Sequence, residues 1–71
     1  MKQYRVEMLQ DGEWIGGHDP NQEGTIIHKN YQAARVEANM CELMWKGKKN
    51  APAGFRVASR EVTEWTEEEN K

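Results

Sequence analysis

Apolar and polar residues alternate at the start of the chain, and a helical period follows further on. In the run of residues 4–9, Tyr4, Val6 and Met8 alternate with Arg5 and Glu7, the two-residue period of a half-buried strand. Asp11 and Gly12 come next, a pair that tolerates positive φ in a tight hairpin turn, so residues 13–15 should return as a second strand. A β-branched run at residues 25–28 predicts a third strand, and residues 55–58 predict a last one.

Residues 30–46 have the period of an amphipathic helix. Asn30 is a good N-cap, and Gly47 is a good residue to end the helix. A helical wheel gives two neighbouring apolar stripes. The first contains Ala33, Val36, Met40, Leu43 and Met44, and the second contains Ala34, Ala38, Cys41 and Trp45. We expect the first stripe to face the core because it has the branched and long side chains, which leaves the second near the surface.

These elements predict an α+β fold with the order β-β-β-α-β. One helix should pack on one face of a small antiparallel sheet of three to four strands, because a chain of 71 residues can bury only one core. We expect a single domain over residues 1–65. Residues 66–71 contain no apolar residue and are expected to form a disordered acidic tail.

Composition narrows the class of protein. The net charge is -2 and the pI is about 5.6, whereas most nucleic-acid-binding domains carry a clear basic excess. Cys41 is the single cysteine, so an intramolecular disulfide is excluded and a reducing compartment is expected. The chain has no signal-peptide pattern at its start and no apolar run of membrane-spanning length. These features predict a cytoplasmic protein.

Candidates for catalysis are few. His18 and Asp19 lie in a loop of turn-forming residues, 16–24, but a metal site needs three or more converging ligands. Cys41 lies on the helix without a neighbouring histidine signature, which is typical of a packing residue. We therefore expect no metal, no cofactor and no enzymatic activity. The loop is either mobile or functional.

Three tryptophans are hard to bury completely in so small a core, and exposed tryptophan is typical of protein-binding hot spots. Trp45 is the best candidate for such an anchor. The alternative is that Trp45 caps the core against Phe55. The candidate partner-binding residues are Trp45, Lys46, Lys48, Lys49, Arg56, Arg60 and Trp14.

The run from the alanine-rich helix through Trp45 to the string Pro52-Ala53-Gly54-Phe55-Arg56-Val57 resembles part of a phage protein family. Its members are the small early proteins with which T-odd coliphages inhibit the RNA polymerase of their bacterial host. The resemblance implies a three-stranded sheet with one helix. The family's two prominent arginines would fall on Ser59 and Glu61, with Arg60 between them, so their roles do not carry over.

These observations together predict a small non-enzymatic module of phage or mobile-element origin. It would dock on a host protein machine such as RNA polymerase and inhibit or modulate it. The alternative is a small nucleic-acid-binding module that uses the sheet with a Lys/Arg patch. The sequence does not fix the partner or the oligomeric state.

Overall fold

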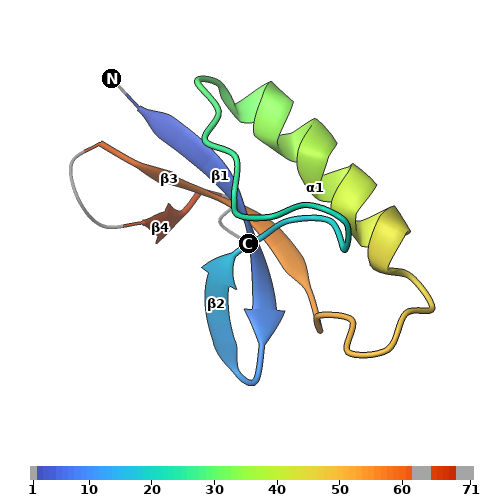
Figure 1. The fold of residues 1–71 in the computed structure, drawn as a ribbon. Helices are drawn as coiled ribbons and strands as arrows, with labels where there is room; N and C mark the ends of the chain where they lie inside the picture. Colours follow the sequence, from blue (N-terminus) through green and yellow to red (C-terminus); the bar gives the residue numbers. More distant parts are fainter. Residues whose placement is uncertain (1, 62–64, 69–71) are drawn as a thin grey trace.

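In the part of the chain that the structure describes, four antiparallel strands form one sheet, and a single helix covers one of its faces (Figure 1). The computed structural model describes residues 2–61 and 65–68. Its elements are β1 (Gln3–Gln10), β2 (Glu13–Gly16), α1 (Tyr31–Trp45), β3 (Phe55–Arg60) and β4 (Thr66–Glu67). The α+β class predicted from the sequence is confirmed, with the strands in the order β2-β1-β3-β4 across the sheet.

The central strand β1 pairs with β2 along one edge and with β3 along the other. The turn to β2 has positive φ at Asp11 (52°) and Gly12 (82°), which confirms the predicted hairpin. In the pairing with β3, Val6 lies opposite Val57 and Glu7 lies opposite Arg56. Because side chains alternate along a strand, the two valines point to one face and the Glu7–Arg56 pair to the other.

The prediction of a strand at residues 25–28 is wrong. Only His28 pairs there, in an isolated bridge to Tyr4 with backbone hydrogen bonds of 2.7 and 2.9 Å. Most of this edge of β1 is already occupied by β2 and by Gly17, whose N–H donates to the carbonyl of Val6 at 2.8 Å. A Cβ at Gly17 would lie 2.8 Å from the Val6 side chain, so glycine permits this close approach. The fourth strand is β4.

The helix begins and ends as predicted, but the face that packs on the sheet is not the expected one. The side chain of Asn30 accepts a hydrogen bond from the Ala33 N–H at 2.8 Å, and Gly47 has φ 79° just after the helix. The face toward the sheet is the one with small side chains, and its buried residues are Ala34, Ala38 and Cys41. The large apolar residues on the other side of α1 are exposed, and these are Val36, Met40, Leu43 and Met44.

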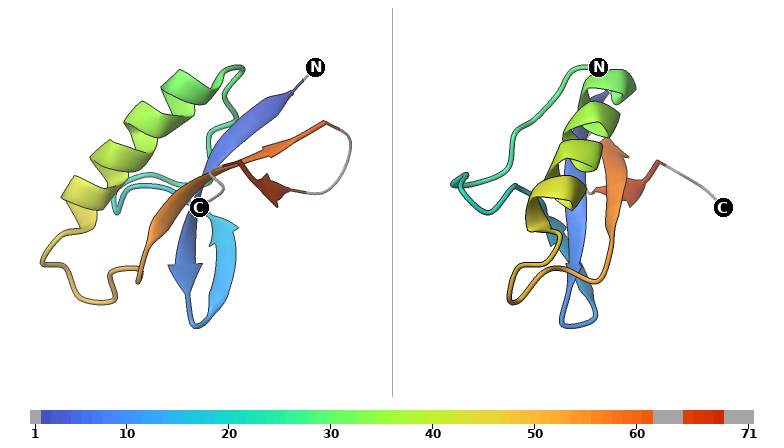
Figure 2. Two further views of the ribbon diagram at one scale, coloured as in Figure 1. Left: turned by 180° about the vertical axis from the view of Figure 1, so that it is seen from behind. Right: turned by 90° about the vertical axis from the view of Figure 1, so that its right-hand side faces the viewer.

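The small side chains let α1 lie close over β1 and β3, as the right-hand view of Figure 2 shows. Val6 and Val57 come from the sheet, and Ala34 and Ala38 come from the helix, and these four form the buried cluster. Aromatic side chains close its margins, and these are Tyr4, Tyr31 and Phe55. These aromatic rings provide the large apolar side chains of the core, which we expected to come from the other face of the helix.

The folded part of the chain extends past the boundary expected at Trp65. Thr66 and Glu67 pair with β3 as β4, and the Ser59 hydroxyl donates to the Glu68 carboxylate at 3.1 Å. Lys2 also contacts Glu68 at 3.0 Å, which raises the pKa of the lysine and lowers the pKa of the glutamate. The remainder of the expected tail, residues 69–71, lies outside the described residues.

No helix within residues 2–61 and 65–68 is long and apolar enough to cross a membrane.

Candidate functional site

A groove lies between the C-terminal half of α1 and the segment that leads into β3. We call it the helix–strand groove; it has a volume of about 460 Å³, within the ~300–1,000 Å³ range of ligand sites. Its lining residues are Asn39, Glu42, Leu43, Trp45, Lys46, Ala51, Pro52, Ala53, Gly54 and Phe55. Leu43, Pro52 and Phe55 are among its apolar lining residues, and the charged lining residues, Glu42 and Lys46, lie on the helix side.

Trp45 is fixed by contacts within the protein and is not a fully exposed side chain. Its indole Nε1 donates to the backbone carbonyl of His18 at 2.7 Å, and the ring is half-buried. The connection from β2 to α1 reaches the C-terminal end of the helix at this point before it returns along β1 (Figure 1). Trp45 therefore ties the loop of residues 16–24 to the helix while its ring also lines the groove.

An apolar stripe on α1 runs into the groove. Val36, Met40 and Leu43 are 59%, 56% and 68% exposed, and their spacing places them on one side of the helix. Leu43 belongs both to this stripe and to the groove lining. From the sequence we expected these residues in the core, so this exposed apolar stripe was not predicted. Their helical spacing was the available signal, but it could not tell the two stripes apart.

Three of the predicted lysines follow the end of the helix in the chain. Lys46 lines the groove, and Lys48 and Lys49 follow in the connection from α1 to β3. All three are exposed. Among the residues that the structure describes, none of the three has an ion-pair partner.

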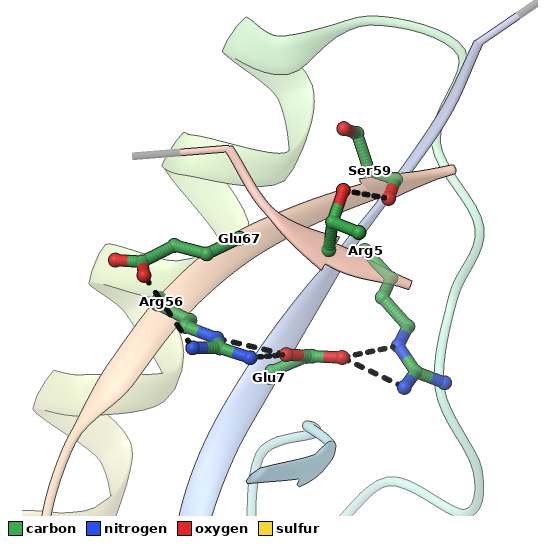
Figure 3. A network of polar contacts seen from close by, with 6 residues as sticks. Arg5, Glu7, Arg56, Ser59 and Glu67 are labelled. Carbon is green, nitrogen blue, oxygen red and sulfur yellow. Dashed lines mark hydrogen bonds and ion pairs between the residues drawn. The ribbon is translucent and has the colours of Figure 1, made fainter. Parts of the chain in front are cut away.

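The sheet face opposite α1 carries a different cluster, which we call the Trp–Arg face. Its residues are Arg5, Glu7, Trp14, Arg56, Arg60 and Trp65. Glu7 is at the centre and is 2% exposed. Nη2 of Arg5 and Nη2 of Arg56 each lie 2.8 Å from one of its carboxylate oxygens, so two strands hold one carboxylate from opposite sides (Figure 3).

Aromatic rings complete the Trp–Arg face. The Arg56 guanidinium lies 4.3 Å from the centre of the Trp14 ring. The guanidiniums of Arg5 and Arg60 lie 4.4 and 4.5 Å from the Trp65 ring. These are cation–π distances, and those of Arg5 and Arg56 add to their ion pairs on Glu7. The face therefore functions as a second stabilising layer on the side of the sheet that has no helix.

The structure separates the seven predicted site residues into two groups. Trp45 and Lys46 line the helix–strand groove, and Lys48 and Lys49 follow them in the chain. The other three lie on the Trp–Arg face: Trp14, Arg56 and Arg60. Alternation along β3 is the reason, since Phe55 points to the helix side and its neighbour Arg56 points to the opposite side.

Other reactive side chains serve the fold. Burial raises the pKa of the Cys41 thiol to about 11, so this group is protonated at neutral pH and is a poor nucleophile. The His28 ring and the Glu37 carboxylate lie 2.6 Å apart and join the connection before α1 to the helix. Within the described part of the chain, no group of three His, Cys, Asp or Glu side chains could hold a metal ion.

Comparisons of this chain with protein-family models, with curated proteins and with solved structures return no match.

Proposed function

We propose that this protein is a small non-enzymatic module that docks on a partner protein through the helix–strand groove and the adjoining apolar stripe of α1. The observation that carries the proposal is the exposure of Val36, Met40 and Leu43 on one side of the helix. Contiguous exposed apolar surface beside a groove is typical of protein interaction sites. A side chain of the partner would enter the groove, and the stripe would extend the contact.

The proposed partner is a host protein machine such as bacterial RNA polymerase, encountered in the cytoplasm. This part rests on the resemblance to the phage inhibitors, and the string that carries it coincides with one wall of the groove. Ala51 to Phe55 line that wall, and Pro52-Ala53-Gly54-Phe55 is the string in question. A phage or mobile-element origin follows from the same argument.

Co-migration with purified bacterial RNA polymerase in size-exclusion chromatography tests the proposal, together with capture from a bacterial lysate. Leu43→Glu places a charge on the most exposed part of the stripe, so it should abolish binding while the fold is kept. Ile27→Glu is the matched control, because Ile27 is 44% exposed and does not line the groove. Stoichiometric binding that survives Leu43→Glu would contradict docking through the groove.

A second candidate function is nucleic-acid binding on the Trp–Arg face. Arginine beside exposed tryptophan on an open sheet is the chemistry that stacks bases and pairs phosphates. Glu7 already neutralises much of the charge of Arg5 and Arg56, which disfavours this function. Salt-dependent binding of single-stranded DNA or RNA that is lost in Arg60→Glu would favour it over protein docking.

A further inference from the structure

The helix–strand groove has apolar lining residues, and three lysines lie in or next to it in the chain. Leu43 from α1 and Phe55 from the start of β3 both line it. Lys46 is part of the lining, and Lys48 and Lys49 lie in the connection that joins the two walls. Glu42 is the single acidic residue among the lining side chains.

These lysines are not used by the rest of the fold. In contrast, Arg5 and Arg56 pair with Glu7, and Lys2 pairs with Glu68. The groove lysines have no such partner among the described residues, and the acidic residue nearest to them in sequence, Glu42, forms no ion pair there. Unpaired cations around an apolar groove are electrostatically complementary to an acidic partner.

We propose that the helix–strand groove binds an acidic peptide segment of a partner protein that carries a large apolar side chain. The apolar side chain fills the space between Leu43 and Phe55, and flanking carboxylates pair with Lys46, Lys48 and Lys49. This proposal rests on the proposed function and adds the chemistry of the segment that is recognised.

The test is an NMR titration of the full chain, labelled with ¹⁵N, with the synthetic octapeptide Glu-Glu-Asp-Leu-Trp-Asp-Glu-Glu. Binding is measured from the changes in amide chemical shifts. One comparison peptide replaces the acidic residues with lysine, and a second replaces Leu-Trp with Ser-Ser. We expect the acidic apolar peptide to shift the amides of the groove, with Ala53 and Gly54 among them. Both comparison peptides should bind at least about tenfold more weakly, because each lacks one half of the recognition.

Charge reversal identifies the cations. The triple variant Lys46→Glu, Lys48→Glu, Lys49→Glu should weaken binding of the acidic peptide by about tenfold or more, since three exposed attractions become repulsions. Lys29→Glu is the control, because this exposed lysine precedes α1 at the opposite end of the helix. Its affinity for the peptide should match that of the unmodified chain.

The alternative outcomes are distinct. If Leu43→Glu abolishes binding of the partner protein and the triple lysine variant leaves it unchanged, docking stands and the acidic segment is wrong. If neither variant affects partner binding, both proposals are wrong. If oligothymidine binds at these lysines with an affinity that Leu43→Glu does not change, the lysines bind nucleic acid and the proposal of an acidic peptide is wrong. Absence of groove shifts with the acidic peptide at about 1 mM also overturns it.

Discussion

The Glu7 carboxylate accepts hydrogen bonds from guanidiniums on two strands and is almost inaccessible to water. A buried carboxylate of this kind is stabilising only while both partners remain. Its position between Arg5 and Arg56 fixes the two guanidiniums, which in turn lie over Trp65 and Trp14. Glu7 therefore fixes the two arginines that contact the tryptophans of the Trp–Arg face from β1 and β3.

Glu7→Gln should lower the free energy of unfolding by about 2–3 kcal/mol, because it removes the buried charge that pairs two half-buried guanidiniums. Urea unfolding followed by tryptophan fluorescence measures this. Glu67→Gln is the control, since Glu67 is exposed and lies 3.7 Å from Arg56, and it should cost less than about 0.5 kcal/mol. Equal costs for the two variants would show that Glu7 does not hold the face together.

Cys41 and Leu43 test the orientation of the helix. Cys41 is 1% exposed, so Cys41→Ser buries a hydroxyl and should cost about 1–3 kcal/mol. Leu43→Ala changes an exposed position and should cost about 0.5 kcal/mol or less. Chemical denaturation of both variants gives the comparison. A larger loss for Leu43→Ala would contradict the structure.

The same cysteine makes stability depend on pH in the alkaline range. Burial raises the pKa of Cys41 from 9.0 to about 11, so the folded state favours the protonated thiol. Its contribution is complete below pH 9 and is lost as the pH rises from 9 through 11. The stability difference between the unmodified chain and Cys41→Ala should shrink over this range. A difference that is constant from pH 8 to 11 would show that the thiol is not desolvated.

At the scale of elements, local patterns were sufficient wherever neighbouring residues decide the structure. The alternation of β1, the Asp11-Gly12 turn and the Asn30 cap were all predictable, since each depends on a few adjacent residues. The short strand β4 was not, because Thr66 and Glu67 carry no apolar pattern and are ordered by pairing with β3. Pairing with a strand that is distant in sequence cannot be predicted from the local pattern of apolar residues.

The helix face was the main misjudgement, and its cause is physical. The size of their side chains suggested that Val36, Met40 and Leu43 face the core. The space between the helix and the sheet is already occupied by two valines of the sheet. A helix can then approach only with small residues, which Ala34 and Ala38 provide. The groove was missed for the same reason, and the Trp–Arg face depends on a strand register that the sequence does not contain.

Truncation of the chain after Trp65 tests the role of β4. It removes the strand and leaves the buried Ser59 hydroxyl without the Glu68 carboxylate, so stability should fall by about 1–2 kcal/mol. Truncation after Glu68 keeps every contact described for this strand and should change stability by less than about 0.5 kcal/mol. Thermal unfolding of the two shortened chains distinguishes them, and equal melting temperatures would mean that β4 contributes nothing.

At the scale of the molecule, the two faces of the sheet are stabilised by different means. The face under α1 has a small apolar core, and the opposite face has ion pairs and rings. Together they hold a short chain without a disulfide, and they leave the large apolar residues on the outer side of α1 exposed. The account of function depends on that freedom, because a docking surface must be uncovered in the unbound protein.

Methionine methyl NMR with a soluble gadolinium chelate measures this directly, and the chain supplies its own control. Met40 and Met44 lie on the outer side of α1 and are 56% and 41% exposed, whereas Met8 is 4% exposed in the sheet. The account predicts strong paramagnetic broadening of the Met40 and Met44 methyls and little broadening of Met8, independent of protein concentration. Protection of Met40 and Met44 equal to that of Met8 would show that this side of the helix is already covered, and would contradict docking through it.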